Sequence, residues 1–238
     1  MTNKDLIKKV VEGSKKYKLG HCGSALSCLD IVDCLYKDVL KEDDLFILSK
    51  GHGSMALYSV LEQYGHKQEW AMHPELNENK GIYATTGSLG HGLPIGVGRA
   101  FAKKLKNKPG RVYVLMGDGE MAEGSVWESL ILAKTLKLDN LTALIDHNKY
   151  GAVYRINEIT SDDQYVLKKK LKAFGFNTSI VDGHNQKEFR KIKNKGLKAI
   201  IFNTIKGNGI DFLEESHAHG FNFFFEPEKY KEVMENLK

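Results

Sequence analysis

Hydrophobic and polar positions follow two different periods along this chain. Over residues 6–18 and 25–40, apolar side chains recur every three to four positions, which predicts helices. Short unbroken apolar runs instead predict strands that are buried on both faces. The expected strands are 45–48, 112–116, 141–145, 177–181 and 199–205. Further helices are expected over 55–64, 95–105, 163–174, 186–195 and 226–238, with a helical segment between the strands 112–116 and 141–145.

The alternation of strands and helices predicts the fold class. Strands separated by helices form parallel sheets, because the chain must cross back before it can start the next strand. We therefore expect an α/β fold, with a doubly wound, mainly parallel sheet and helices on both faces. A chain of 238 residues with only four prolines and no Pro-rich linker is expected to form a single domain over 1–238.

Charge, hydropathy and cysteine content disfavour some classes of function and indicate a cellular compartment. The formal net charge is +5, but lysines and arginines are spread along the chain and not gathered with aromatic residues, which disfavours nucleic-acid binding. No hydrophobic run reaches membrane-spanning length and the first ten residues lack a signal-peptide core, so we expect no membrane contact. The cysteines Cys22, Cys28 and Cys34 form no CxxC pair, which is typical of reduced thiols in a cytoplasmic protein.

The stretch 112–148 carries the strongest chemical signal. One buried strand ends in Gly117-Asp118-Gly119, and a second strand leads to Asn148. Both polar side chains follow the carboxyl ends of strands, the edge of an open α/β sheet at which ligands bind. A carboxylate and an amide oxygen suit Mg²⁺, which prefers a few protein oxygens together with phosphate oxygens and water. A Gly-Asp-Gly turn alone also occurs in ordinary strand-turn-helix units, so the prediction depends on Asn148 as well.

Other glycine-rich loops place a histidine or a lysine beside glycines. Such loops leave backbone N–H groups available to anions, above all before a helix. Each of these residues taken alone is equally consistent with an exposed turn. They are His21, Lys50, His52, His91, Lys206 and His219, and one more histidine, His73, lies in a polar loop without glycines. Asp182 and His184 are interpreted as turn residues, and Asn185 as the cap of the next helix.

Taken together and in order, these motifs resemble the N-terminal, thiamine-diphosphate-binding domain of the transketolases over essentially the whole chain. The matching segments are GHCGSA at 20–25, LSKGH at 48–52, MHPE at 72–75, TTGSLGHG at 85–92, GDGEMAEG at 117–124, IDHN at 145–148, KGNG at 206–209 and HG at 219–220. Any one of them could arise by chance, whereas all of them in this order are specific to the family.

The resemblance implies a cofactor site. Asp118 and Asn148 are expected to hold Mg²⁺, or another divalent cation such as Ca²⁺ or Mn²⁺, together with the backbone carbonyl of Tyr150. The residues expected around the diphosphate and thiazolium of thiamine diphosphate are Lys50, His52, Gly119, Asn148, Lys206 and His219. The residues expected near its aminopyrimidine are Gly87, Ser88 and Leu89.

The resemblance also implies a reaction, the transfer of a two-carbon ketol unit from a ketose phosphate to an aldose acceptor. The cofactor carries the carbanion chemistry, while the protein binds, orients and moves protons. Histidines titrate near neutral pH, so a group of them can act as base and as acid. The histidines expected to face the sugar are His21, His73 and His219, with Ser24 and His91 close by. Glu123 resembles the acidic residue that family members place at the dimer interface.

Three features depart from the family pattern. Cys22 stands where family members usually have proline, which makes the position of His21 less certain. Either His217 or His219 could be the active-site histidine, and we choose His219 because it precedes glycine. The segment FNFFF at 221–225 replaces a more polar stretch and is either a partner-binding surface or, more commonly, a buried tail.

The match covers only the first domain of a full transketolase. In the family, the glutamate that activates the aminopyrimidine and the arginines that bind substrate phosphate lie in the domains that follow. We therefore expect this chain to be inactive alone and to pair with a separate C-terminal subunit, forming an α2β2 assembly in the cytoplasm.

Two other functions stay open at this point. A thiamine-diphosphate enzyme of the deoxyxylulose-phosphate-synthase or 2-oxoacid dehydrogenase type would keep the metal motif but decarboxylate its donor. The histidines in GHCGS and MHPE favour sugar chemistry instead. A non-catalytic cofactor-binding subunit is the other alternative, although no key motif is visibly broken. The pattern does not indicate the donor sugar, the acceptor sugar or the pathway.

Overall fold

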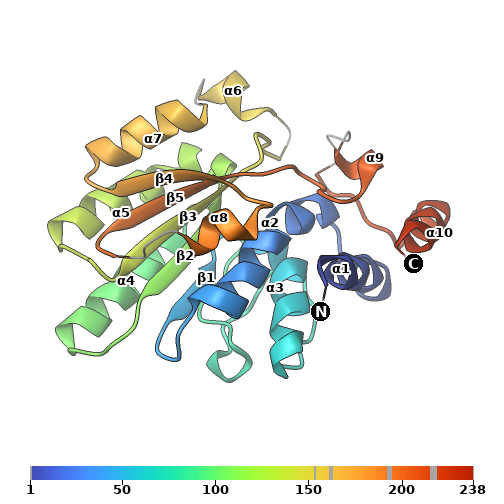
Figure 1. The fold of residues 1–238 in the computed structure, drawn as a ribbon, viewed down its shortest axis with the longest axis horizontal. Helices are drawn as coiled ribbons and strands as arrows, with labels where there is room; N and C mark the ends of the chain where they lie inside the picture. Colours follow the sequence, from blue (N-terminus) through green and yellow to red (C-terminus); the bar gives the residue numbers. More distant parts are fainter. Residues whose placement is uncertain (1, 153, 161–162, 192–194, 215–218, 238) are drawn as a thin grey trace.

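A five-stranded parallel sheet forms the centre of the molecule (Figure 1). The computed structural model describes residues 2–152, 154–160, 163–191, 195–214 and 219–237. Neighbouring strands follow the order β1-β2-β3-β5-β4, and each neighbouring pair is parallel. The strands are β1 (Leu45–Leu48), β2 (Val112–Gly117), β3 (Leu141–His147), β4 (Asn177–Asp182) and β5 (Lys198–Asn203). The expected strands are therefore confirmed, with ends that shift by a residue or two.

Helices cover both faces of this sheet (Figure 1). One face packs against α4 (Gly92–Leu105), α5 (Gly124–Thr135) and α7 (Gln164–Ala173), whose apolar residues join one hydrophobic cluster with the strands. The other face packs against α1 (Asn3–Tyr17), α2 (Cys22–Cys34), α3 (Ser54–Leu61) and α8 (Gln186–Arg190) in a second cluster. The prediction of a doubly wound α/β fold is confirmed.

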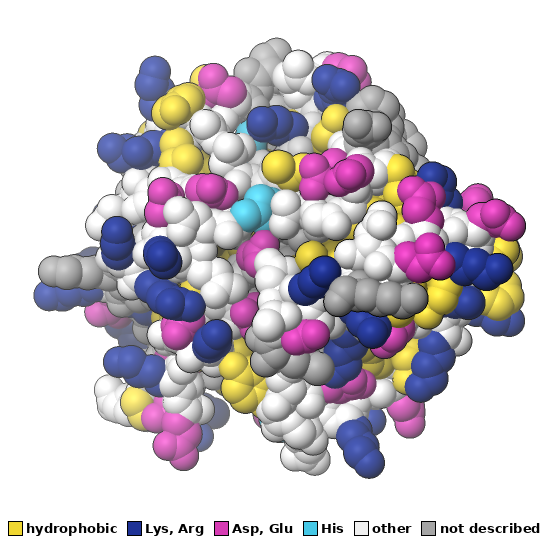
Figure 2. All heavy atoms as spheres, turned by 45° about the vertical axis from the view of Figure 1, so that its right-hand side comes forward, with side chains coloured by type: hydrophobic (Ala, Val, Ile, Leu, Met, Phe, Trp, Pro, Cys, Tyr) yellow, Lys and Arg dark blue, Asp and Glu magenta, His cyan; other side chains and the backbone are white. Residues whose placement is uncertain are grey.

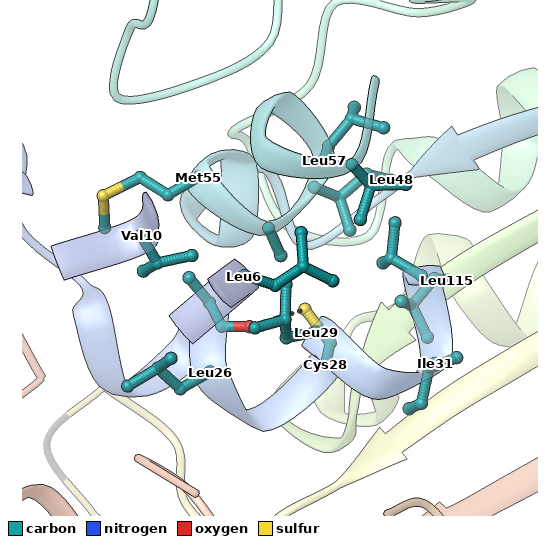
Figure 3. Packing of buried hydrophobic residues seen from close by; sticks show 14 of the residues in the cluster. Leu6, Val10, Leu26, Cys28, Leu29, Ile31, Leu48, Met55, Leu57 and Leu115 are labelled. Carbon is teal, nitrogen blue, oxygen red and sulfur yellow. Dashed lines mark hydrogen bonds between the residues drawn. The ribbon is translucent and has the colours of Figure 1, made fainter. Parts of the chain in front are cut away.

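The second cluster anchors α2 against the sheet. Figure 3 shows side chains of α1, α2, α3, β1 and β2 meeting there, among them Leu6, Leu29, Leu48 and Leu115. Successive strand residues point to opposite faces, so Leu48 joins this cluster while Ile47 joins the other. Burying each large aliphatic side chain contributes about 1.5–3 kcal/mol. Helix α2 is thereby fixed in position, and its first residues lie beside the ends of the strands.

The register of the sheet brings the candidate loops to one edge. Gly117 of β2 pairs with Asp146 of β3, and His147 of β3 pairs with Asn203 of β5. The carboxyl ends of parallel strands meet at the same edge, at which open α/β sheets bind ligands. The segments that carry Asp118, Asn148 and Lys206 therefore leave the sheet side by side.

The helices differ from the predicted ones mainly at their ends. Helix α2 begins at Cys22 and not at residue 25, and it continues as a π-helical turn, Leu35–Val39. Helix α8 ends at Arg190, and residues 192–194 of the expected helix lie outside the described part of the chain. Two short helices, α6 (Ile156–Ile159) and α9 (Asp211–Glu214), were not predicted, because four residues are too few to show a hydrophobic period.

The C-terminal segment packs at the periphery and ends in α10 (Pro227–Asn236), as expected (Figure 1). Within the aromatic run, Phe223 is fully buried among Phe221, Phe212 and Tyr230, whereas Phe225 is 71% exposed. Phe223 thus anchors the tail, while Phe225 stays on the surface. All three cysteines are free and buried. None of the helices in the described ranges combines the length and apolar composition that a membrane crossing requires.

Candidate active site

Loops from β1, β2, β3 and the C-terminal region enclose a narrow cleft at the carboxyl edge of the sheet. Of the residues expected from the sequence, the cleft is lined by Ser24, Lys50, His52, Leu89, Asp118, Gly119, Asn148, Tyr150 and His219. Figure 2 views the side of the molecule that carries α9 and α10, and histidine side chains reach the surface near the centre of this face. Acidic and basic side chains are interspersed around them (Figure 2).

Asp118 and Asn148 are held by the same short loop after β3. Asp118 Oδ2 accepts a hydrogen bond from the Lys149 backbone N–H at 2.5 Å, and its Oδ1 accepts one from the Gly119 N–H at 2.9 Å. Asn148 Oδ1 accepts from the Tyr150 N–H at 3.0 Å. Lys149 has φ 72°, a left-handed conformation that is uncommon for a residue other than glycine. The loop is therefore bent so that both expected metal ligands lie against it.

The electrostatics of Asp118 suit a bound cation. Burial, and then the charge of Asp146, raise the pKa of Asp118 to about 8, although hydrogen bonds from Lys149 and Gly119 oppose the shift. A divalent cation beside the carboxylate would offset both causes. The described residues contain no group of three or more His, Cys, Asp or Glu side chains that could hold a metal. The expected set of one carboxylate, one amide and one backbone carbonyl fits a hard cation that completes its shell with phosphate and water oxygens.

A buried ion pair lies beneath the cleft. Lys50 and Asp146 are 1% and 0% exposed at their side chains, and the Lys50 ammonium donates to the Asp146 carboxylate. The ammonium also donates to the Ser24 carbonyl at 3.0 Å. Asp146 further accepts from the hydroxyls of Ser27 and Thr204. Burial lowers the pKa of a lysine, but the Asp146 charge outweighs it, and the pKa of Lys50 is raised overall.

Glu120 joins three of the motif loops. Its Oε2 accepts from the Gly117 N–H at 2.8 Å, and its Oε1 accepts from the Gly90 N–H at 2.9 Å and from the Ser49 hydroxyl. Burial raises the pKa of this carboxyl, and the bonds from Ser49, Gly90 and Gly117 partly oppose the shift. The segments LSKGH, TTGSLGHG and GDGEMAEG are therefore fixed to one another through one side chain.

Three of the expected histidines form a cluster. The ring centroids of His21 and His219 lie 4.6 Å apart, and that of His52 lies 5.6 Å from His21 and 5.3 Å from His219. His21 has φ 66°, and its Nδ1 donates to the His219 carbonyl at 3.0 Å, which leaves Nε2 as a proton acceptor. His217, the alternative to His219, lies outside the described residues.

Burial keeps these imidazoles neutral. Burial is the largest cause that lowers the pKa of His21, and nearby His73, Lys206 and Lys50 lower it further. Burial and the positive charge of Lys50 bring the pKa of His52 well below its usual value. Burial, together with His21, Lys206 and Lys50, lowers the pKa of His219 to about 4. At neutral pH the cluster therefore consists of neutral imidazoles, which can accept protons.

His73 lies next to this cluster but is exposed and takes no part in the ring contacts described above. Gly87 has φ 146°, and a Cβ there would come within 2.9 Å of the His73 ring. The MHPE and TTGSLGHG segments are therefore in close contact, and Gly87 permits it. Leu89 of the same loop lines the cleft, while Ser88 and His91 are exposed.

Lys206 is a buried cation for which no hydrogen-bond partner is found in the described part of the chain. It is 3% exposed, and its Nζ is among the buried side-chain atoms for which the described residues offer no partner, as is His219 Nδ1. Its Nζ lies 5.3 Å from the Tyr150 ring centroid. Burial, and then the charge of Lys50, lower the pKa of Lys206, whereas Asp118 raises it. A buried ammonium without a hydrogen bond is costly, so this arrangement fits an anion such as a diphosphate.

Comparison with known proteins identifies the family. The family model described as "Transketolase, thiamine diphosphate binding domain" matches residues 6–223. The chain belongs to the transketolase family. It is 36% identical over 234 residues to an apulose-4-phosphate transketolase subunit of Phocaeicola vulgatus, covering 87% of this chain and 82% of that protein. It is 33% identical over 261 residues to the 6-deoxy-6-sulfo-D-fructose transketolase subunit SqwG of Clostridium sp., covering 97% of this chain and 93% of that protein.

Solved transketolases share the fold. The transketolase of Leishmania mexicana superimposes with a TM-score of 0.80 at 25% identity, covering 99% of this chain and 40% of that one. That of Campylobacter jejuni gives a TM-score of 0.79 at 26% identity, covering 99% of this chain and 42% of that one. The thiamine-diphosphate-binding α/β fold is thus confirmed, and this chain spans less than half the length of these two solved transketolase chains.

Sequence reasoning missed three residues that organise the candidate site, namely Asp146, Glu120 and Ser27. The signal for Asp146 was present, because an aspartate inside the buried run LTALIDH needs a partner that neutralises it. Glu120 lies in the matching segment GDGEMAEG, but a second acid near Asp118 is equally consistent with a surface residue. Ser27 gave no signal, since a serine within a helix is unremarkable in a sequence.

Proposed function

We propose that this chain is the cofactor-binding subunit of a two-chain transketolase. The proposed reaction moves a two-carbon ketol unit from a ketose, normally phosphorylated, to an aldose acceptor. The observation that carries the proposal is the meeting of Asp118, Asn148 and the buried Lys206 at one sheet edge, in a chain of the transketolase family. A carboxylate, an amide and a buried ammonium together form a receptor for a divalent cation and a diphosphate.

The proposed cofactor site uses the loops after the strands. Asp118, Asn148 and the Tyr150 carbonyl hold Mg²⁺, or Ca²⁺ or Mn²⁺ in its place. The diphosphate and thiazolium lie among Lys50, His52, Gly119, Asn148, Lys206 and His219, with Gly87, Ser88 and Leu89 near the aminopyrimidine. The anion is supported by Lys206 Nζ, a buried ammonium that lacks a hydrogen-bond partner among the described residues.

The proposed chemistry divides between cofactor and protein. Thiamine diphosphate, when bound, supplies a nucleophilic carbon and an electron sink. The chain's histidines move the protons: His21 presents Nε2 as a base toward a sugar hydroxyl, and His73 and His219 accept or return protons at neighbouring oxygens. Neutral imidazoles suit this work, because a proton taken in one half of the reaction must be returned in the other.

The proposed partner is a separate C-terminal subunit, in an α2β2 assembly. Relatives of which this chain covers 82% and 93% are named as transketolase subunits, which supports a two-chain enzyme. Their names specify a phosphate ester and a sulfonate of ketoses, which supports an anionic ketose as the donor. The sugars themselves depend on a pocket that the partner completes.

A binding experiment tests the cofactor site. Thiamine diphosphate is titrated into the purified chain with Mg²⁺, and the heat of binding gives the Kd. The Asp118→Asn variant keeps the shape but loses the charge, so binding should weaken about 100-fold, and the dependence on Mg²⁺ should vanish. Asp139→Asn, an exposed carboxylate near the opposite edge of the sheet, serves as the control. Equal Kd values for wild type and Asp118→Asn would contradict the metal site.

A turnover experiment tests the reaction. The chain is assayed alone and with its partner subunit, using a ketose phosphate or pyruvate as donor. We expect ketol transfer from the ketose only, and only with both subunits present. His21→Ala should lower kcat at least about 100-fold, with the Kd of the cofactor nearly unchanged, because His21 acts on the sugar. Full ketol transfer by the lone chain, or decarboxylation of pyruvate, would overturn the proposal.

A further inference from the structure

One buried carboxylate on α2 collects polar groups from three distant segments. Asp30 is 4% exposed and accepts hydrogen bonds from Asn3 Nδ2, from His184 Nδ1 at 2.8 Å and from Asn208 Nδ2 at 3.4 Å. His184 follows β4, and Asn208 follows β5. Asp30 therefore joins the turns after two neighbouring strands to the helix that follows His21.

His184 continues this network to the loop of Lys206. Its Nε2 accepts a hydrogen bond from the Ile205 backbone N–H at 2.9 Å. Because Nε2 accepts, Nδ1 must carry the proton that is donated to Asp30, so His184 is held as one neutral tautomer. The sequence favours a simple turn residue here, but the structure shows a histidine with both ring nitrogens engaged.

Lys206 is thereby flanked by two attachments that end at the same carboxylate. On one side, Ile205 is tied to Asp30 through His184; on the other, Asn208 contacts Asp30 directly. Gly207 and Gly209 have φ values of 82° and 88°, so the backbone around Lys206 adopts turns that glycine allows. Such a loop needs contacts with other segments to keep a buried ammonium in place. One more such contact is the hydrogen bond that the Gly207 N–H donates to the Gly23 carbonyl at 2.9 Å.

We propose that Asp30 and His184 are positioning residues that hold Lys206 in place to receive the diphosphate of the cofactor. This inference rests on the proposed cofactor site. His184 touches neither cofactor nor substrate; it acts by fixing the Ile205 peptide, next to which the Lys206 side chain extends. The loss of this attachment leaves the Ile205 N–H unpaired and lets the ammonium move from the position that binds the anion.

The test is a double-mutant cycle on cofactor affinity. His184→Leu removes both hydrogen bonds, and the Kd for thiamine diphosphate with Mg²⁺ should rise about tenfold in the full chain. In a Lys206→Met background the same substitution should change the Kd less than about twofold, because the group that it positions is gone. His184→Gln, whose amide offers both a donor and an acceptor, should recover most of the affinity.

A matched control separates positioning from general stability. Gln186 Nε2 donates to Asp33 Oδ2 at 3.0 Å, which is also a bond between α2 and the segment after β4, but it does not reach the Lys206 loop. Gln186→Leu should lower the melting temperature about as much as His184→Leu and leave the Kd unchanged. Melting temperatures of all variants are measured on the same samples.

The outcomes distinguish this inference from the proposed function. If wild type binds the cofactor and Lys206→Met weakens binding, but His184→Leu binds like wild type, the positioning role is wrong and the cofactor site stands. Equal losses from His184→Leu in both backgrounds would also overturn it, since the effect would then not pass through Lys206. If wild type binds no thiamine diphosphate, alone or with its partner, the proposed function itself fails.

Discussion

At the scale of single residues, the candidate site is built on charges that are buried and matched. Lys50 and Asp146 are nearly inaccessible, and each satisfies the other. Their attraction must offset a large desolvation cost, so such a pair adds little net stability over an apolar pair of the same shape. The loss of one partner destabilises the fold strongly, because the remaining charge is buried and cannot be solvated.

The first prediction concerns this pair. Lys50→Met should lower the free energy of unfolding by about 3–5 kcal/mol, since it leaves the Asp146 carboxylate uncompensated. The double variant Lys50→Met/Asp146→Asn should recover much of that loss, because the amide can still accept from Ser27 and Thr204. Urea unfolding followed by circular dichroism gives both values. Lys104→Met, in the exposed pair with Asp139, should cost at most about 1 kcal/mol. Similar losses at Lys50 and Lys104 would contradict this account.

At the scale of elements, α2 connects the core to the site. The cap residue His21 and the helix residues Ser24, Ser27 and Asp30 follow one another at intervals of three residues, so their positions wind around α2. Their partners are, in order, the His219 carbonyl, the Lys50 ammonium, the side chains of Asp146 and Asn148, and His184. Between these positions, apolar side chains of α2 pack in the hydrophobic cluster of Figure 3. Segments after β1, β3 and β4, together with the segment of His219, are therefore attached to this one helix.

The second prediction tests this helix at its middle residue. Ser27→Ala removes the hydroxyl that donates to Asp146 and accepts from Asn148, and it should lower the free energy of unfolding by about 1–3 kcal/mol. It should also weaken Mg²⁺-dependent cofactor binding several-fold, because Asn148 loses a contact that orients its amide. Ser129→Ala, whose hydroxyl bonds within α5, is the matched control for stability. Unaltered cofactor binding in Ser27→Ala would show that Asn148 needs no support from α2.

The sequence predicts more at this scale than at the scale of residues. The strands are predicted because short unbroken apolar runs are typical of buried strands. The position of the loops after them, at one edge of the sheet, follows because the strands are parallel. The start of α2 is not predicted, since glycines around residues 20–23 indicate a break. In the structure Gly23 belongs to the helix, where a Cβ would come within 3.3 Å of the Lys206 side chain. Gly23 is explained by its contact with Lys206, which lies far along the chain. The sequence around Gly23 cannot reveal such a contact.

The roles that the family resemblance gives to the site residues stay predictions. That three of the histidines lie together is, in contrast, observed in the structure. The structure places His21, His52 and His219 in ring contact, although they come from three separate segments. Period and spacing could not predict this cluster, because it depends on how the loops cross the sheet edge. The hydrogen bonds of His184 could likewise not be predicted from the sequence, because its partners lie on α2 and after β5.

At the scale of the whole molecule, we expect the proposed partner subunit to contact the surface around α5. Glu123 is exposed at the start of α5, next to the loop that carries Asp118. On the same helix Ile131 and Leu132 are 56% and 47% exposed. Apolar side chains on a surface helix beside a candidate active site are consistent with a subunit interface. Two relatives are named as transketolase subunits, and the proposed partner subunit is the occupant that we expect at this surface.

The third prediction reverses the charge at that surface. Glu123→Arg should weaken assembly with the partner chain about tenfold or more, because a residue adapted to an interface is replaced by one of opposite charge and larger size. Sedimentation of mixed subunits should show a shift from the α2β2 species to smaller ones, with ketol transfer reduced in parallel. The Kd of thiamine diphosphate for the free chain should stay the same, since Glu123 is not among the described residues that line the cleft. Glu235→Arg, an exposed residue on α10 far from this helix, should assemble normally. If Glu123→Arg sediments and turns over like wild type, the interface must lie elsewhere on the chain, and the apolar residues of α5 would need another explanation.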